Sequence, residues 1–242
     1  MEVNKYNMNP IPLESDLNWW WYKAKLNLIK LIIKDLNFSK SINILEIGPG
    51  RGNNINYLNN IGEVDILEID EEFVNHLKTY NKKEISKYFM DINEVDKKYD
   101  LILLLDVLEH IENSEEYMSA LTKYLKKEGI VIIGVPAYKS LWSIHDEKLL
   151  HFRRYNWKKL YSDCQSYKIL KRYGFNYLLF PIRYMQIKLM KNVQTTNETN
   201  RQVNGFLYLI SLIENCLRLI GFNPKFGISL YAVVQKRQGK NS

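Results

Sequence analysis

The sequence predicts an α/β fold with a doubly wound, mainly parallel sheet, and three observations support that prediction. Short apolar runs alternate with amphipathic stretches between Ile42 and Val135, which is the pattern of successive βαβ units. The run from Tyr99 to Leu105 is almost continuously apolar, as expected of a strand that is buried on both faces of such a sheet. A glycine-rich turn, Gly48 to Gly52, joins a strand to a helix, as in doubly wound sheets that bind nucleotides.

One domain accounts for the whole chain, and its parts follow in order. Residues 1–41 are expected to form an N-terminal arm and a first helix, which starts at three tryptophans and carries apolar side chains at helical spacing. Residues 42–176 are expected to form the sheet core. Within this core we expect strands at 42–47, 64–69, up to Met90, 99–105, 130–135 and 167–173, and helices at 53–60, 71–80, 115–127 and 156–164.

A helical insertion is expected at residues 177–226, before the closing strand and tail at 227–242. Its two helices are separated by the polar segment 191–204, which we expect to be disordered. The second helix, 206–220, has a narrow polar stripe formed by Ser211, Glu214, Asn215 and Arg218. We expect the rest of its apolar girth to pack against the edge of the sheet, with a dimer or a membrane surface as the alternatives.

The composition excludes several classes of protein. Hydrophobic side chains make up 46% of the 242 residues, which suits a globular core and not a disordered chain. The two cysteines, Cys164 and Cys216, show no CxxC spacing, so we expect free thiols and not metal ligands. The sequence shows neither a secretory leader nor an apolar span of ~20 residues, which favours a cytoplasmic location.

The net charge of +7 favours acidic partners. Anionic small molecules and anionic lipid surfaces both fit this charge, so peripheral membrane contact is one expectation. DNA is not expected as a partner, RNA stays open, and the sequence does not determine the oligomeric state.

The turn Gly48–Pro49–Gly50 is the first candidate ligand site. Glycines here let backbone amides approach a ligand at the positive end of a helix dipole. Asp70 follows the second strand, about twenty positions on, where a carboxylate binds ribose hydroxyls in nucleotide sites. These features also fit NAD, but the dinucleotide fingerprint requires glycine where this chain has Asn53. Glu46, two residues before the turn, suits a ligand with an ammonium group better than a pyrophosphate.

With ILEIGPGRG at 44–52, the sequence resembles the class I S-adenosylmethionine-dependent methyltransferases, whose first motif is written E/D-x-G-x-G-x-G. The resemblance implies a Rossmann-like sheet of seven strands with the last strand antiparallel, and S-adenosyl-L-methionine as the cofactor. It implies that the methionine part of the cofactor meets Glu46, Gly48, Pro49 and Gly50. Asp70 would then bind the ribose, and Asp91 with Ile92 the adenine.

The segment Asp106–Ile111 (DVLEHI) follows the fourth strand, as in many methyltransferases of this class. The resemblance places Asp106 near the amino-acid end of the cofactor. In ubiquinone-type O-methyltransferases and small-RNA terminal 2′-O-methyltransferases, an acid-x-x-Glu-His arrangement at this place binds a divalent metal. The corresponding residues here are Asp106, Glu109, His110 and His151. Many relatives with DVLEH hold no metal, so a divalent metal is not the favoured interpretation.

The segment 135–155 (VPAYKSLWSIHDEKLLHFRRY) resembles a bacterial and archaeal branch of type 11-like methyltransferases, which combines an aromatic first helix with LWS-x-HD and H-x-RRY. In that fold this loop faces the methyl acceptor. An imidazole titrates close to neutral pH and can act as a general base, and the candidates are His110, His145 and His151. The expected acceptor contacts are Trp142, Arg153, Arg154 and Tyr155. The two arginines suit a phosphate or a carboxylate.

The resulting prediction is an S-adenosylmethionine-dependent methyltransferase that acts on a hydroxyl of a small-molecule, glycan or lipid-linked acceptor. Oxygen is preferred over nitrogen because a loop histidine or a metal would help to remove the hydroxyl proton. Two alternatives stay open, namely an NAD(P)-dependent oxidoreductase and a non-catalytic S-adenosylmethionine-binding protein. The identity of the acceptor is not determined by the sequence.

Overall fold

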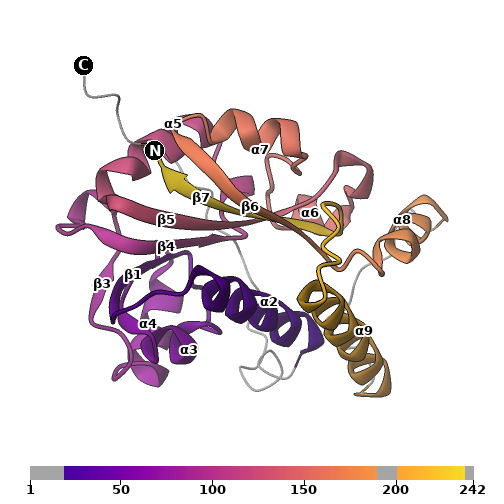
Figure 1. Cartoon of the computed structure of the whole chain (residues 1–242), viewed down its shortest axis with the longest axis horizontal. Coiled ribbons are helices and arrows are strands. Elements are labelled where there is room, and N and C mark those ends of the chain that lie inside the picture. Colours follow the sequence, from indigo (N-terminus) through magenta and orange to yellow (C-terminus); the bar gives the residue numbers. More distant parts are fainter. Residues whose placement is uncertain (1–18, 190–200, 238–242) are drawn as a thin grey trace.

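A seven-stranded sheet between two layers of helices forms the centre of the computed structural model, which describes residues 19–189 and 201–237 (Figure 1). The order across the sheet is β3-β2-β1-β4-β5-β7-β6. Strands β1 to β5 run parallel, and β7 is antiparallel to both of its neighbours. The predicted α/β class with an antiparallel last strand is therefore confirmed. The strands are β1 (Ile42–Ile47), β2 (Gly62–Leu67), β3 (Lys87–Phe89), β4 (Tyr99–Leu105), β5 (Leu125–Pro136), β6 (Tyr167–Phe175) and β7 (Ser229–Lys236).

The helices cover the two faces of the sheet unequally. Helices α2, α3 and α4 lie on one face, and α5 and α7 lie on the other (Figure 1). None of the described helices is long and apolar enough to cross a membrane. The helices are α2 (Trp20–Leu36), α3 (Ile55–Asn59), α4 (Glu71–Tyr80), α5 (Ser114–Leu121), α6 (Ile144–Lys148), α7 (Trp157–Asp163), α8 (Phe180–Leu189) and α9 (Arg201–Leu219), with 3-10 turns η1 (Ile92–Glu94), η2 (Leu108–His110), η3 (Thr122–Tyr124) and η4 (Lys139–Leu141).

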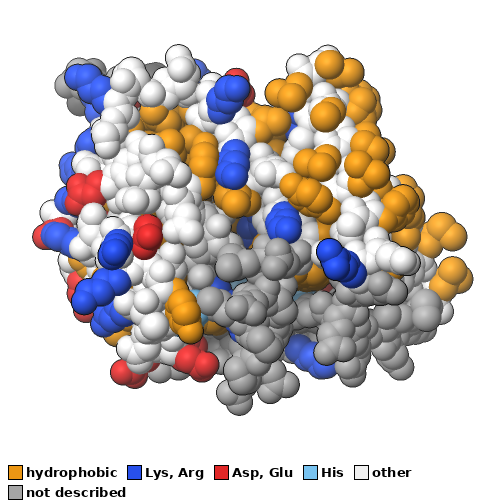
Figure 2. Space-filling view, turned by 90° about the horizontal axis from the view of Figure 1, so that it is seen from below, with side chains coloured by type: hydrophobic (Ala, Val, Ile, Leu, Met, Phe, Trp, Pro, Cys, Tyr) orange, Lys and Arg blue, Asp and Glu red, His pale blue; other side chains and the backbone are white. Residues whose placement is uncertain are grey.

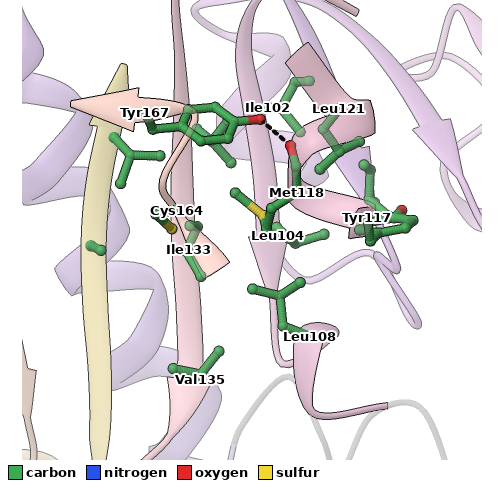
Figure 3. Close-up of a cluster of buried hydrophobic side chains, with 14 of the residues drawn as sticks. Ile102, Leu104, Leu108, Tyr117, Met118, Leu121, Ile133, Val135, Cys164 and Tyr167 are labelled. Carbon is green, nitrogen blue, oxygen red and sulfur yellow. Dashed lines mark hydrogen bonds between the residues drawn. The ribbon is translucent and has the colours of Figure 1, made fainter. Parts of the chain in front are cut away.

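Alternation along β4 divides the core into two layers. Ile102 and Leu104 pack toward Met118 of α5, whereas Leu101 and Leu103 belong to the cluster that includes α2. In Figure 3 the Tyr167 hydroxyl donates to the carbonyl of Met118 at 2.7 Å, which satisfies a polar group inside the first layer. Each fully buried aliphatic side chain contributes ~1.5–3 kcal/mol, so the two layers hold the sheet rigidly beneath its loops.

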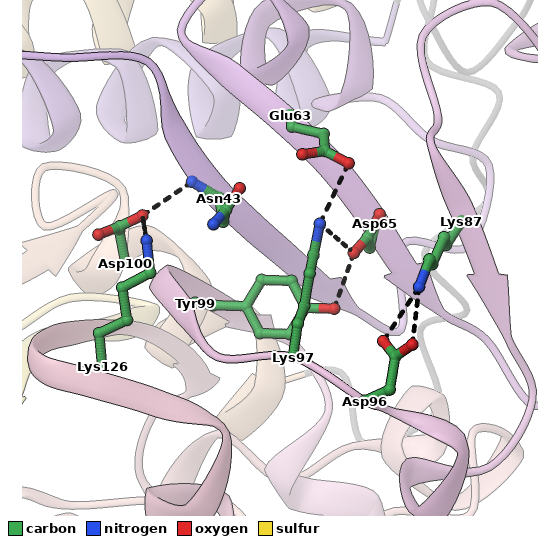
Figure 4. A network of polar contacts seen from close by, with 9 residues as sticks. All are labelled: Asn43, Glu63, Asp65, Lys87, Asp96, Lys97, Tyr99, Asp100 and Lys126. Atoms are coloured by element: carbon green, nitrogen blue, oxygen red, sulfur yellow. Dashed lines mark hydrogen bonds and ion pairs between the residues drawn. The ribbon is translucent and has the colours of Figure 1, made fainter.

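A network of acids and lysines ties the sheet together around the start of β4 (Figure 4). Asp65 is fully buried, and it accepts a hydrogen bond from the Tyr99 hydroxyl at 2.8 Å and pairs with Lys97 at 2.9 Å. Asp100 accepts from the backbone of Asn43 at 2.9 Å and from Lys126 at 2.6 Å. Through these contacts the network joins β1, β2, β4 and β5.

The largest difference from the predicted elements lies between α5 and β5. The predicted helix 115–127 already ends at Leu121, and β5 begins at Leu125, five residues before the predicted strand 130–135. Lys126 and Lys127, which the prediction placed in the helix, lie in the strand. After the buried Leu125, the side chains of 126–128 face solvent, and the strand is buried from Gly129 onward.

The end of β2 also differs from the prediction. The strand predicted at 64–69 begins at Gly62 and ends at Leu67. It stops there because the next residue, Glu68, turns its carboxylate toward the backbone of the glycine loop and not into the sheet.

The insertion contains two helices, as predicted, but the second is placed differently. Residues 191–200 of the predicted disordered segment lie outside the described residues, whereas 201–204 are the first turn of α9 and are not disordered. Helix α9 packs on α2 and turns its polar stripe inward. Leu207, Tyr208 and Ile210 pack on the core, but the remaining apolar side of the helix is exposed and does not pack against the sheet edge as expected. The buried polar side chains find partners in the strand and loop before α8, which the sequence pattern alone does not reveal.

Candidate active site

The candidate site lies at the place in the sheet where the order of successive strands changes direction. Strand β1 has β2 on one side and β4 on the other, so the loops after β1 and β4 diverge and leave a crevice at their carboxyl ends. Gly48 follows β1, Asp70 follows β2 and Asp106 follows β4. The fold therefore collects the three predicted segments at one edge.

The glycine loop adopts a backbone that only glycine accepts easily. Gly48 and Gly50 have φ values of +64° and +54°. A Cβ atom on Gly48 would lie 2.7 Å from Val107 Cγ2, whereas one on Gly50 would meet nothing within 4 Å. Gly48 thus permits close packing against the β4 loop, and the backbone at Gly50 borders open space. Open backbone of this kind suits a bound ligand.

Glu46 is a buried carboxyl group with one unsatisfied oxygen. Its Oε1 accepts a hydrogen bond from Asn54 Nδ2 at 2.6 Å, and Oε2 has no hydrogen-bond partner among the described residues. Burial raises the pKa of Glu46 to about 7. A buried, half-satisfied carboxyl group is costly unless a ligand supplies a donor, so Glu46 fits a site for an ammonium group.

Glu68 is a site residue that the sequence analysis missed. Its Oε2 accepts from the backbone amide of Gly50 at 3.1 Å, and its Oε1 accepts from that of Asp70 at 3.0 Å. The residue therefore ties the glycine loop to the end of β2. The only sequence signal was an acid two positions before Asp70, which alternation alone would assign to the strand.

Asp70 and Asp91 occupy the ends of β2 and β3, and each begins the next turn. Asp70 caps α4 by accepting from the amide of Glu72 at 2.8 Å, and Asp91 caps η1 by accepting from the amide of Asn93 at 2.8 Å. Ile92 packs at the margin of the core beside them. Capping fixes each carboxylate at its strand end and leaves its second oxygen for a ligand.

Lys25, on α2, is the second candidate residue that the sequence analysis missed. Its Nζ donates a hydrogen bond to Asp106 Oδ2. Burial alone would lower the pKa of Lys25, but the Asp106 carboxylate outweighs it and raises the pKa above its ordinary value. The Lys25 charge also acts on Glu46 and Glu109. One cation therefore faces three acids in the crevice.

Asp106 holds an unusual backbone conformation. Its φ is +56°, in the left-handed region, and its amide donates to the carbonyl of Gly134 at 2.9 Å. A non-glycine residue held in this region is strained, and such strain concentrates at ligand sites. The conformation brings the Asp106 carboxylate to Lys25, which leaves it outside the metal-type cluster predicted for it.

Glu109, His110 and His151 form that cluster without Asp106. Their ligand atoms all lie within 4.8 Å of one another, and the rings of His110 and His151 meet edge to face at 4.5 Å. Glu109 is buried, and its Oε2 has no hydrogen-bond partner in the described part of the chain. Burial, followed by the charge of Asp106, raises the pKa of Glu109 well above its ordinary value. Burial, followed by the neighbouring His151, lowers the pKa of His110 to about 3, so this imidazole is neutral at pH 7.

Asp146 orients His151 from the acceptor loop. His151 Nδ1 lies 2.9 Å from Asp146 Oδ1, and Arg154 Nε donates to the same oxygen at 2.7 Å. Burial opposes ionisation of Asp146, but the hydrogen bonds from His151 and Arg154 lower its pKa below the ordinary value. The predicted long loop contains α6, which a Ser143–Asp146 capping box begins. His145 lies on α6 with an exposed side chain and is not part of the cluster.

The predicted acceptor contacts take different positions. Tyr155 is fully buried and donates to the Leu108 carbonyl at 3.2 Å, so it has no surface to offer an acceptor and that expectation is corrected. Arg153 donates to the carbonyls of Ile111 and Glu112 at 2.9 and 2.7 Å and so holds the loop after η2. Trp142 of the acceptor loop is half-buried, and its Nε1 lies 3.4 Å from Glu147 Oε1.

Comparison with known families decides between the interpretations of this site. Residues 14–179 match the family model described as a methyltransferase domain, which is well over half of the chain. The chain belongs to the methyltransferase domain family. Together with the sheet order, this membership makes the protein a class I S-adenosylmethionine-dependent methyltransferase and disfavours the nicotinamide alternative.

Relatives of the methyltransferase include enzymes that act on oxygen. The ubiquinone biosynthesis O-methyltransferase of Rickettsia bellii is 25% identical over 217 residues, which cover 78% of this chain and 89% of that protein. The protein of the same name from Rickettsia canadensis is 26% identical over 196 residues, covering 75% and 81%.

Solved structures show the same fold at low sequence identity. A SAM-dependent methyltransferase from Archaeoglobus fulgidus has a TM-score of 0.56 and 17% identity, covering 88% of this chain and 94% of that one. The N-methyltransferase NodS from Bradyrhizobium japonicum, in complex with S-adenosyl-L-homocysteine, has a TM-score of 0.54 and 14% identity, covering 95% and 90%. At such identities the methyltransferase shares the fold with these proteins, and the fold does not choose the acceptor atom.

Proposed function

We propose that the methyltransferase transfers the methyl group of S-adenosylmethionine to a hydroxyl oxygen of a small molecule. The observation that carries this proposal is the cluster of Glu109, His110 and His151 after β4, because it would offer a proton acceptor, His151, to a hydroxyl bound beside the cofactor. The names of the relatives, which are O-methyltransferases, support the same acceptor atom.

The charges in the crevice suit the amino-acid end of the cofactor. The ammonium group would face Glu46 and Asp106, and the carboxylate would face Lys25, so that the ligand's two charges meet charges of opposite sign. Gly48, Pro49 and Gly50 would line this end with backbone. Asp70 would bind the ribose hydroxyls, and Asp91 with Ile92 would contact the adenine.

Methyl transfer is an in-line displacement in which the sulfur–carbon bond breaks as the oxygen–carbon bond forms. The acceptor hydroxyl must lose its proton, and His151 is the base that its surroundings favour. With Nδ1–H donating to the ionised Asp146, Nε2 carries the lone pair that accepts the proton, and Asp146 stabilises the resulting imidazolium. The products are S-adenosyl-L-homocysteine and a methyl ether. The protein contributes mainly by positioning the two reactants.

The same cluster fits a divalent cation as a second candidate role. One unsatisfied carboxylate oxygen and two imidazoles are donors that Mn²⁺ or Zn²⁺ accepts, and the Asp146–His151 pair has the arrangement by which proteins orient metal-bound histidines. When bound, the cation would lower the pKa of the acceptor hydroxyl. The two roles of His151 exclude each other, so elemental analysis of protein purified without chelator, together with activity in EDTA, distinguishes them.

The proposed acceptor is a small hydroxylated molecule. Arg154 and Arg183 bring positive charge near His145, and this charge would suit an anionic group on the acceptor. A glycan and a lipid-linked acceptor are narrower forms of the same proposal.

The test incubates the full chain with S-adenosylmethionine and either catechol or an aromatic amine of the same size, and follows S-adenosyl-L-homocysteine and product mass. We expect methylation of the hydroxyl compound, reduced about a hundredfold or more by His151→Asn with little change in cofactor affinity. His145→Asn is the matched control and should retain most of the activity. Methylation of the amine alone, or equal losses in the two variants, would overturn the proposal.

A further inference from the structure

Helix α9 buries polar side chains together with the half-buried Leu207, Tyr208 and Ile210, and it exposes an apolar stripe. Its polar residues face the protein, and Ser211, Glu214 and Arg218 are all buried. Its apolar side faces outward, with exposed fractions of 62% for Phe206 and 53% for Leu209. The exposed apolar side chains recur at helical spacing and form one stripe along the helix, made by Val203, Phe206, Leu209 and Ile213.

Specific contacts fix this orientation. Glu214 Oε1 accepts from the amide of Leu178 at 2.8 Å, and Ser211 donates to Asn176 Oδ1 at 3.0 Å. Arg218 lies 3.2 Å from Glu214 and donates to the carbonyl of Gly174. Rotating α9 to hide its apolar stripe would leave the backbone amide of Leu178 and the carbonyl of Gly174 without these partners. These polar contacts therefore hold the apolar stripe of α9 on the outside of the protein.

Neighbouring segments extend the apolar surface. Helix α8 and the residue two before it expose a second stripe at helical spacing, made by Leu178, Ile182, Met185 and Leu189. The turn after α9 adds Leu219, Ile220, Phe222 and Phe226. Figure 2 shows these apolar side chains gathered along the side of the molecule that α9 forms. We call these three groups the insertion surface. Monomeric proteins rarely leave so extended an apolar surface in water unless something binds it.

The exposed charges that the described residues of segment 177–228 contribute have one sign. Lys188, Arg201 and Lys225 are exposed beside it. Within the described residues between 177 and 228, Glu214 is the one acid, and it is buried against Arg218. An outward apolar face whose own exposed charges are cations is the pattern of helices that lie in the headgroup region of anionic membranes.

We infer that the insertion surface docks on an anionic lipid bilayer. The apolar stripes of α8 and α9 enter the boundary between headgroups and acyl chains, and the bordering lysine and arginine side chains meet the lipid phosphates. A second copy of this chain is a poorer occupant, because a two-fold contact would set these cations against each other on a chain that already carries a net charge of +7.

Docking would also bring the candidate site to the membrane. Phe180 of α8 packs edge to face on Tyr138 of the acceptor loop at 5.7 Å, and the charge of Arg183 acts on Asp146. A lipid-soluble acceptor could then reach His151 without crossing water. This last step rests on the proposed function, whereas the docking itself does not.

The test is flotation of the full chain with phosphatidylcholine vesicles that contain or lack phosphatidylglycerol. We expect the protein to float with the anionic vesicles and not with the neutral ones, and high salt to weaken the binding. The apolar pair Phe206→Ser with Leu209→Ser, and the charge pair Lys188→Glu with Arg201→Glu, should each reduce binding at least about tenfold. Tyr80→Ser with Met90→Ser, and Lys82→Glu with Lys83→Glu, are matched changes away from this surface and should float as the unchanged protein does.

Two results would overturn the inference. One is a failure of the unchanged protein to float with anionic vesicles. The other is a concentration-dependent dimer in sedimentation that the Phe206 and Leu209 variant abolishes, which would assign the surface to a second copy. Methylation of water-soluble catechol should be equal in all these variants, so a failure of membrane docking is distinguishable from a failure of the proposed reaction.

Discussion

Glu46 and Lys25 are two buried ionisable residues of the candidate site, and they differ in their partners. Among the described residues Glu46 Oε2 has no hydrogen-bond partner, whereas Lys25 donates to Asp106. On the proposed function, a zwitterionic ligand would supply a cation to Glu46 and an anion to Lys25. Glu46 and Lys25 each lead to one prediction.

The first prediction concerns stability and pH at Glu46. Because its pKa is raised to about 7 in the folded state, the folded protein holds a proton that the unfolded chain releases at lower pH. The stability contributed by this group is therefore full at acid pH and is lost as pH rises to about 7. Glu46→Gln keeps the acceptor for Asn54 and cannot ionise. It should raise the free energy of unfolding at pH 8 by up to about 3 kcal/mol while it weakens cofactor binding.

Denaturant unfolding at pH 5 and pH 8 checks this prediction. The gain from Glu46→Gln should be much smaller at pH 5, where the native carboxyl group is already protonated. A variant that is less stable than the native protein at pH 8 would contradict the assigned pKa.

The second prediction separates the two ends of the cofactor at Lys25. Lys25→Gln removes the cation that would meet the ligand's carboxylate and should weaken S-adenosyl-L-homocysteine binding about tenfold or more. 5′-Methylthioadenosine lacks the amino-acid group, so its affinity should change little. Calorimetry with both ligands measures the difference, and equal losses for the two would mean that Lys25 acts only through the placement of α2.

The turn between β1 and α3 is held by contacts from other elements of the fold. Its backbone is determined by glycines with positive φ, by Val107 packed on Gly48, and by the Glu68 carboxylate that holds the Gly50 amide. Three strands thus fix one loop. The geometry of the ligand site is set by the sheet and not by the loop alone.

The third prediction tests this dependence. Gly48→Ala adds a Cβ 2.7 Å from Val107 at a left-handed φ, so we expect a loss of about 1–3 kcal/mol in stability together with loss of cofactor binding. Gly205→Ala is the matched control, because Gly205 lies in α9 with open space around it. That change should be neutral or stabilising by about 0.5–1 kcal/mol. Thermal unfolding and calorimetry of both variants measure the contrast, and equal effects would contradict it.

Across the whole molecule, the sequence predicted features that depend on local pattern. The apolar run 99–105 and the glycine turn led to the sheet and to the place of the crevice, because alternation and turn chemistry are set by neighbouring residues. The orientation of α9 was predicted wrongly. The partners of Glu214 and Arg218 are a backbone amide and a carbonyl more than thirty residues away, and no periodicity reveals them.

The positions of the candidate residues divide in the same way. The places of Asp70 and Asp91 at strand ends could be predicted because strand ends are visible in the sequence. Lys25 could not, since its partner Asp106 lies 81 positions away. Tyr155 was misplaced because the motif around it gave no sign that its ring fills the core under η2.

Titration calorimetry with S-adenosyl-L-homocysteine shows whether the cofactor binds at the carboxyl ends of β1 and β2. We expect one ligand per chain. Asp70→Ser retains a capping oxygen for α4 but is too short to hold the ribose, and it should weaken binding about tenfold or more. Glu71→Ser, at the next position, should bind as the native chain does. Tight binding of NADH with no response to S-adenosyl-L-homocysteine, or equal affinity in the Asp70 variant, would contradict the account.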